Sequence, residues 1–121
     1  MSASRQNFSI EWHRNVAVII PPADIEKMQW NLMDEAAEAI LAPLSKTKAP
    51  MLIFDLKGVS FFGSIFMSLL LRCHKFVKTR GGDMVLSGAS NMARELLGVT
   101  ALDTLWALYD TREEALDAVG M

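Results

Sequence analysis

The sequence predicts a single α/β domain: a mixed, mostly parallel β-sheet with an N-terminal hairpin and about four helices. From Met51 onward, short apolar runs alternate strictly with amphipathic segments. Such alternation is typical of parallel strands joined by right-handed helical crossovers. Before Met51, two apolar segments lie close together, which indicates an antiparallel hairpin. A chain of 121 residues is long enough for one core of ordinary size.

The hairpin is predicted from two segments of different pattern. Residues 1–7 are polar and are expected to form a flexible N-terminal tail, so the domain is predicted to span residues 8–121. Residues 8–12 alternate apolar and polar side chains, which indicates a half-buried strand. Residues 16–20 form an unbroken, β-branched apolar run and therefore predict a deeply buried strand.

A long first helix is predicted after the hairpin, with Asp24 as its N-cap. Apolar residues recur there at spacings of three and four, which gives one apolar face: Ile25, Met28, Leu32, Met33, Ala36, Ala37, Ile40 and Leu41. Pro43 is expected to end this helix. The next apolar run, residues 51–54, predicts a buried strand that leads into Asp55.

The remaining elements follow from the same alternation and from capping signals. Ser90 is a suitable N-cap, and Thr111 with Glu114 has the form of a capping box. In order, we expect a helix at 65–79, a strand at 84–86, a helix from Ser90 to Gly98, a strand at 105–109 and a helix to about Val119.

Composition argues against several classes of protein. Twelve Lys and Arg against 14 Asp and Glu give a net charge of −2, which does not favour nucleic-acid binding. The longest nearly apolar run, 59–71, is shorter than the roughly 20 residues that span a bilayer, so no membrane insertion is expected. The single cysteine, Cys73, excludes an intramolecular disulfide and suits a reducing compartment. We therefore expect a cytoplasmic protein.

The sequence offers little for catalysis. Cys73 and His74 are neighbours on a predicted helix and point about 100° apart, so they cannot chelate one ion from one face. The sequence contains neither of the common glycine-rich phosphate-binding motifs, and two histidines make a Ser-His-Asp set hard to argue. We expect no metal, no cofactor and no catalytic residue. A small enzyme or nucleotide binder is the least favoured alternative, because fold alone does not decide function.

The stretch from Asp55 to Ser64 is the most informative part of the sequence. A buried strand ends at Asp55, a loop follows, and Ser64 is predicted at the N-cap of the next helix. Function in parallel α/β domains is usually found where a strand feeds a helix. Ser64 could serve only as a helix cap, or it could accept a phosphate at the positive end of the helix dipole.

The outer face of that helix predicts a docking surface for a protein. Ser64, Ser68, Arg72, Lys75 and Thr79 form a polar stripe. Met67 and Leu71 lie beside the stripe, and no acidic residue occurs from 65 to 82. Two exposed apolar side chains could arise by chance, or they could form a patch with a basic rim. The partner-binding candidates are Phe62, Gly63, Ser64, Met67, Ser68, Leu71, Arg72 and Lys75. Trp12 and Trp30 are expected in the core, and the oligomeric state is left open.

Five stretches together resemble the STAS domain of bacterial anti-sigma factor antagonists. The main one is residues 52–64, in which an apolar strand ends in Asp-Leu, passes through a Val-x-Phe loop and reaches Ser64. The others are the Arg-Gly-Gly turn at 80–82, the helix end at 96–99, residues 102–109 and residues 111–116. The resemblance covers residues 8–119.

This resemblance implies a fold and a function. The fold would be a single STAS-like domain whose helices pack mainly on one face of the sheet. The function would be a non-catalytic interaction module in signal transduction and transcription regulation. Its partner would be a serine kinase that doubles as an anti-sigma factor. By position, Ser64 corresponds to the phosphoacceptor of the family and Asp55 to a structural acid at the strand end.

The chain departs from the family pattern around Ser64. Gly63 stands where the family usually has Asp, Ile65 replaces a small hydroxyl residue, and Phe66 replaces a glycine. These differences keep a second interpretation open. The chain could be a constitutive scaffold or accessory subunit, in a stress-signalling assembly or beside a transporter, that is not phosphorylated at Ser64.

Overall fold

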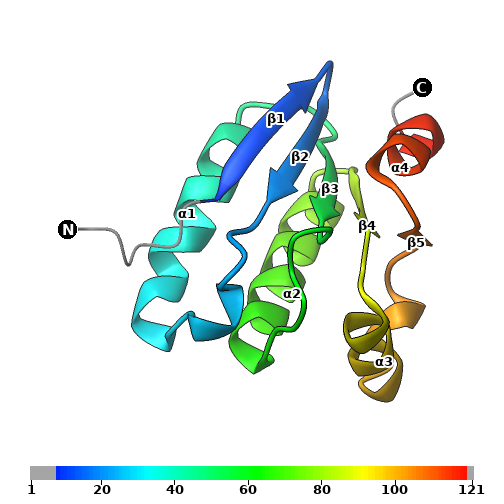
Figure 1. Cartoon of the computed structure of the whole chain (residues 1–121). Helices are drawn as coiled ribbons and strands as arrows, with labels where there is room; N and C mark the ends of the chain where they lie inside the picture. The colour runs from blue at the N-terminus through cyan, green and yellow to red at the C-terminus, as the bar shows by residue number, and fades with distance from the viewer. Residues whose placement is uncertain (1–7, 120–121) are drawn as a thin grey trace.

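The computed structural model describes residues 8–119, which form a five-stranded mixed sheet with helices on both faces (Figure 1). The strand order follows the chain: β1 Ser9–His13, β2 Val16–Ile20, β3 Met51–Asp55, β4 Asp83–Ser87 and β5 Leu108–Tyr109. β1 pairs antiparallel with β2, and the other neighbours are parallel. The predicted fold class is confirmed. The tail predicted at residues 1–7 and the last two residues of the predicted domain lie outside the described part.

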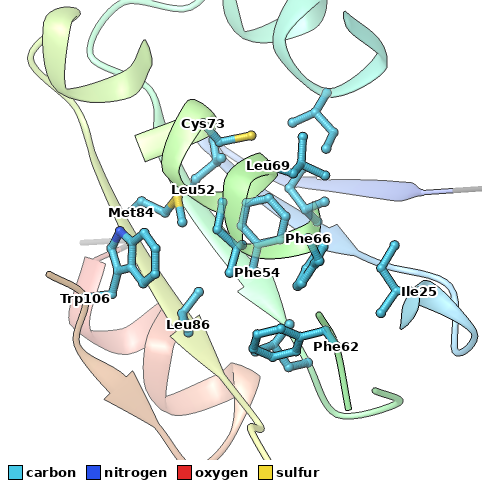
Figure 2. Close-up of a cluster of buried hydrophobic side chains, with 14 of the residues drawn as sticks. Ile25, Leu52, Phe54, Phe62, Phe66, Leu69, Cys73, Met84, Leu86 and Trp106 are labelled. Atoms are coloured by element: carbon cyan, nitrogen blue, oxygen red, sulfur yellow. The ribbon is translucent and has the colours of Figure 1, made fainter. Parts of the chain in front are cut away.

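The four helices divide between the two faces of the sheet. They are α1 Met33–Leu44, α2 Ser64–Thr79, α3 Asn91–Val99 and α4 Arg112–Val119. The first three contribute to the larger core cluster, in which Phe54, Phe62 and Phe66 are prominent (Figure 2). α4 covers the opposite face, where Ala115 packs with residues of β2, β3 and β4.

The prediction that a long first helix starts directly after Asp24 is wrong. Residues 24–32 instead form two 3-10 turns, η2 Ile25–Lys27 and η3 Trp30–Leu32, and α1 begins only at Met33. Asp24 makes no side-chain cap, and Met28 is extended. Ile25 and Met28 are buried at a spacing of three, which fits a 3-10 turn as well as an α-helix. Pro43 was also expected too early as a stop, because it lies inside the last turn of α1.

The last predicted strand is also shorter than expected. Only Leu108–Tyr109 pairs with β4, whereas η4 Leu102–Thr104 occupies the residues just before this segment. Trp106 precedes the strand, and its side chain is buried in the core. Its indole N–H donates to Nδ1 of His74 over 2.9 Å. The apolar character of residues 105–109 thus reflects packing against α2 as well as strand pairing.

Two further sequence expectations can be compared with the structure. The caps predicted at Ser90 and Thr111 are confirmed: Ser90 accepts from the Ala93 N–H, and Thr111 and Glu114 bond each other's backbone N–H. The expectation that Trp12 and Trp30 lie in the core is wrong, because they are 43% and 60% exposed. Both occur in segments with few covering neighbours, an edge strand and a 3-10 turn.

Candidate functional site

The loop between β3 and α2 is held firmly against the sheet. The Leu56 N–H donates to the Ser87 carbonyl over 2.8 Å, which continues the β3–β4 ladder beyond the strand. The hydroxyl of Ser90, the N-cap of α3, donates to the Ser60 carbonyl over 2.9 Å. Leu56 and Val59 are buried in the larger core cluster. These contacts fix the path of the chain into α2.

Aromatic packing fixes the N-terminal end of α2. The rings of Phe62 and Phe66 meet edge to face with centroids 5.1 Å apart, and Phe66 meets Phe54 at 6.1 Å. Edge-to-face pairs of this kind add to the stabilisation from burial. The prediction that Phe62 contacts a partner is therefore corrected, because its side chain is fully buried. Phe66 is buried too, so the bulk that replaces the family glycine points inward.

Ser64 is the first residue of α2, not its N-cap. The N-cap position belongs to Gly63, which has an extended backbone, and no side chain caps this end of the helix. Ser64 is exposed, and its hydroxyl makes no hydrogen bond with any residue in 8–119. The simple capping role weighed for Ser64 is thus corrected: the hydroxyl is free at the positive end of a 16-residue helix.

The outer face of α2 presents both polar and apolar side chains. Leu71 is 40% exposed, and Lys75 is also exposed. Met67 and Ser68 are half-buried, with Met67 packed against the core cluster. We refer to Gly63, Ser64, Met67, Ser68, Leu71 and Lys75 as the outer α2 face.

Arg72 is left out of this face because its side chain is paired with a residue of α1. Its Nη1 donates to Oδ1 of Asp34 over 2.7 Å. Two other cations of α2 and its end are also engaged within the chain. Lys78 pairs with Asp83 at 3.6 Å, and the guanidinium of Arg80 stacks over the Phe76 ring at 4.6 Å. The rim of the outer α2 face is therefore less basic than the sequence alone indicated.

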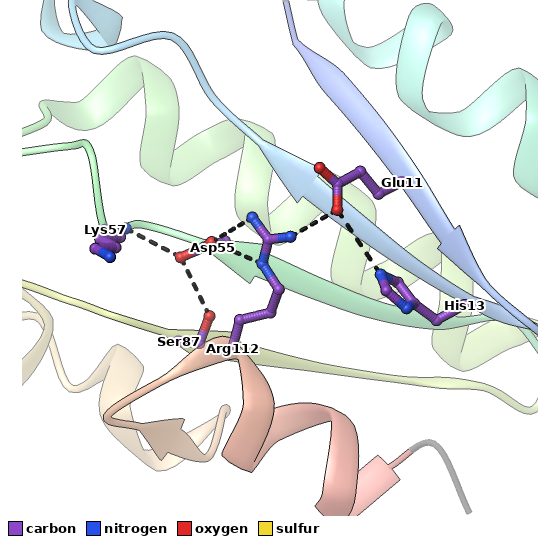
Figure 3. Close-up of polar contacts among 6 residues, drawn as sticks. All are labelled: Glu11, His13, Asp55, Lys57, Ser87 and Arg112. Carbon is purple, nitrogen blue, oxygen red and sulfur yellow. Dashed lines mark hydrogen bonds and ion pairs between the residues drawn. The ribbon is translucent and has the colours of Figure 1, made fainter.

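Asp55 lies at the centre of a polar cluster at the end of β3, on the face of the sheet that α4 covers (Figure 3). Its Oδ2 accepts from Nε and Nη2 of Arg112 at 3.1 and 2.9 Å. Its Oδ1 accepts from the Lys57 N–H at 3.1 Å and from the Ser87 hydroxyl at 3.5 Å. Nη1 of Arg112 reaches Oε1 of Glu11 at 2.6 Å. We call Asp55, Lys57, Ser87, Arg112 and Glu11 the strand-end cluster.

Electrostatics hold Arg112 of this cluster in its charged form. Burial lowers the pKa of Arg112, but hydrogen bonding to Asp55 and the charges of Asp55 and Glu11 outweigh it and raise that pKa overall. Arg112 comes from α4, Glu11 from β1 and Asp55 from β3, so the cluster ties three elements together. Asp55 thus has the contacts of a residue that holds structure.

Sequence reasoning did not identify the partners of Asp55. Arg112 lies 57 residues from Asp55 and Glu11 lies 101 residues from Arg112, and no local pattern signals such pairs. It also passed over Phe61, which is 43% exposed beside the buried Phe62. Val59 and Phe62 are buried, whereas Ser60 and Phe61 between them are exposed. Only the path of the loop shows which of the two neighbouring rings, Phe61 or Phe62, points into the core.

A cleft of about 470 Å³ adjoins the strand-end cluster but does not include the outer α2 face. Its charged side chains largely neutralise one another: Arg94 pairs with Asp110 at 2.9 Å, and Arg112 pairs with Asp55. Burial raises the pKa of the Cys73 thiol to about 12, so this side chain is not a ready nucleophile. Within residues 8–119 no group of His, Cys, Asp and Glu is placed to hold a metal ion. No helix of the described part is long and apolar enough to cross a bilayer.

Comparisons with known proteins agree with this arrangement. The STAS domain family model matches residues 26–115. The chain is similar to an anti-sigma-factor antagonist (STAS) domain protein from Planctomyces limnophilus, with 33% identity, coverage of 94% of this chain and 98% of that one, and a TM-score of 0.80. An anti-sigma factor antagonist from Mycobacterium paratuberculosis shows 23% identity, covers 99% and 98% of the two chains, and gives a TM-score of 0.78.

The phosphorylated form of the Bacillus cell fate determinant SpoIIAA has the same fold. It shows 19% identity, covers 93% of this chain and 99% of that one, and gives a TM-score of 0.66. At this identity the likeness concerns the fold alone. The family model spans most of the chain, and the Planctomyces protein is similar along nearly its whole length. The chain therefore belongs to the STAS domain family and resembles its anti-sigma factor antagonists.

Proposed function

We propose that this protein is a non-catalytic antagonist that binds a serine kinase acting as an anti-sigma factor, and that phosphorylation of Ser64 switches the binding off. The observation that carries the proposal is the state of Ser64: exposed, first in α2, and free of any hydrogen bond within residues 8–119. A kinase needs an accessible hydroxyl, and this one can be modified without breaking an existing contact. The proposal places the protein in the bacterial cytoplasm, in signal transduction and transcription regulation.

The outer α2 face supplies the proposed contact surface. Leu71 offers an exposed apolar side chain, Met67 offers an adaptable one at its inner edge, and Lys75 adds a positive charge. An apolar centre with a polar rim is the usual anatomy of a protein interface. Ser64 lies on the same side of the helix, one and two turns before Ser68 and Leu71.

The switch would act through charge and desolvation. A phosphate carries about −1.5 to −2 charges at neutral pH, and burying it against a partner without cationic neighbours is costly. Arg72, the arginine on the same polar stripe as Ser64, is engaged by Asp34. The phosphate would therefore face the partner and disrupt packing at Leu71 and Met67.

The alternative is a constitutive STAS scaffold or accessory subunit. Gly63 favours this alternative, because no carboxylate stands beside Ser64 where the family usually has Asp. The two functions predict the same docking surface and differ only in the role of Ser64. The bulk of Phe66 does not decide between them, because its ring is buried.

The test is affinity capture from the native cell with four forms of the protein, followed by mass spectrometry. A serine kinase captured by wild type and Ser64→Ala, but lost with Ser64→Asp and Leu71→Asp, supports the switched antagonist. Purified kinase must then phosphorylate wild type and not Ser64→Ala. Equal capture of the partner by wild type and Ser64→Asp, with loss only in Leu71→Asp, selects the constitutive module instead.

A further inference from the structure

Strand β1 lies at one edge of the sheet, with β5 at the other. Its only strand neighbour among the described residues is β2, so no strand within residues 8–119 pairs with its outer side (Figure 1). Exposed edges of sheets are usually protected by charged side chains, above all Lys, by Pro or by a bulge. The five residues Ser9–His13 contain neither Pro nor Lys, and all five pair with β2 without a bulge. Their one acidic side chain, Glu11, is engaged by Arg112.

The backbone groups that face outward from β1 follow from the hairpin. β1 and β2 are joined by a two-residue turn that closes on the pair His13 and Val16. A two-residue hairpin closes on a hydrogen-bonded pair, and such pairs alternate along an antiparallel ladder. Counting back from His13, the N–H and C=O groups of Ile10 and Trp12 point away from β2.

The pattern of apolar and polar side chains along this edge is symmetric about Ile10. Phe8, Ile10 and Trp12 lie on the face of the sheet that carries α1 and α2, where Phe8 and Ile10 pack against the core cluster and Trp12 is 43% exposed. Ser9 and Glu11 lie on the opposite face, because Glu11 is in register with Val18. A second copy, running antiparallel, would present the same apolar and polar alternation.

We propose that the outer edge of β1 is a self-association surface, at which two copies of this chain pair β1 antiparallel across a two-fold axis at Ile10. Phe8 then faces Trp12 of the second copy, Ile10 faces Ile10, and Ser9 faces Glu11. Aromatic and β-branched cross-strand pairs are the stabilising ones in sheets. The two five-stranded sheets become one continuous sheet with β5 at each end, and the closed two-fold contact leaves no β1 edge for a third copy.

Other antiparallel registers are disfavoured by particular residues. A register centred on Glu11 places two carboxylates directly opposite each other, which is destabilising. A register centred on Trp12 needs Arg14 as a strand residue, whereas Arg14 has φ 61° in the hairpin turn. The Ile10-centred register has none of these costs.

The association is expected to be weak. One strand pair buries less surface than the roughly 1,200–2,000 Å² of stable complexes, so assembly should need tens to hundreds of micromolar protein. Sedimentation velocity of the full chain across that range should show a monomer–dimer equilibrium. A monomer at every concentration overturns the proposal.

The location is tested with edge variants. Ile10→Pro removes an outward N–H and leaves the β2 ladder intact, since Pro is tolerated on edge strands; it should abolish the dimer, and Ile10→Val should keep it. Trp12→Lys is a second variant, which places a charge on the exposed edge without a proline and should also give a monomer. Persistence of the dimer in both Ile10→Pro and Trp12→Lys overturns the assignment to this edge.

The register is tested by oxidation of single cysteines. Opposed Cα atoms of a hydrogen-bonded pair lie about 5.5 Å apart, within the range that a disulfide spans. Ile10→Cys should therefore cross-link into a disulfide dimer at concentrations where Trp12→Cys does not. The native Cys73 is buried and serves as an internal background. Equal cross-linking of the two variants contradicts the Ile10-centred register.

Discussion

The strand-end cluster and the outer α2 face adjoin the two ends of the loop between β3 and α2, yet they are built in opposite ways. Asp55 is 7% exposed, and its carboxylate accepts four hydrogen bonds from three residues. Ser64, nine positions later, is exposed, and its hydroxyl has no partner in residues 8–119. The same short segment thus contains one polar group that is fully engaged and one that is free.

This difference indicates which positions can change without loss of the fold. A buried, fully bonded carboxylate leaves several groups unsatisfied when it is altered, and each such group costs free energy. A free surface hydroxyl can gain a charge at little cost to folding. The loop between Asp55 and Ser64 fixes the position of one relative to the other, because Leu56, Val59 and Phe62 anchor it in the core.

The largest effect is expected at Phe62. Phe62→Ala should lower the free energy of unfolding by about 3–5 kcal/mol, because it removes a fully buried ring that packs edge to face on Phe66. Phe61→Ala is the matched control; at 43% exposure its loss should be below about 1 kcal/mol. Urea denaturation of both variants measures the difference. Similar losses in the two variants would show that the loop is not anchored as described.

The fold was predictable because the sequence patterns that indicate it are local. The incorrect prediction for the Phe62 side chain shows where local patterns are not sufficient. Alternating apolar runs indicate strands and helices, and Ser90 and Thr111 carry their own capping signals. Val59 to Phe62 is a loop, so no period assigns its side chains to the core or to solvent. The contact between Asp55 and Arg112 depends on α4 meeting the end of β3, which only the assembled sheet provides.

A second test removes the central acid of the strand-end cluster. Asp55→Ala should lower the free energy of unfolding by about 2–3 kcal/mol, because Ser87 is buried and Arg112 loses two of its three hydrogen bonds. Asp55→Asn retains an acceptor for the Lys57 N–H and should cost less. The measurement is again equilibrium denaturation by urea, monitored by circular dichroism.

A double-mutant cycle assigns that loss to the correct pair. Asp55→Ala combined with Arg112→Ala should cost about 1–2 kcal/mol less than the sum of the single variants, because the two residues share their hydrogen bonds. Ser64→Ala with Arg112→Ala is the matched control and should be additive. Additivity in both cycles would mean that Asp55 and Arg112 do not support each other.

The smallest effect on stability is expected at Ser64, where the proposed effect on binding is large. The first turn of α2 contains no acidic residue, so Ser64→Asp adds a negative charge at the positive end of the helix dipole. It should raise the free energy of unfolding by about 0.3–1 kcal/mol, whereas Ser64→Ala should change it by less than about 0.5 kcal/mol. Thermal and urea unfolding at low salt measure both, and a clear destabilisation by Ser64→Asp would contradict the position assigned to the hydroxyl. Loss of the partner in a variant that folds at least as well as wild type can then be attributed to the surface itself, because unfolding is excluded as its cause.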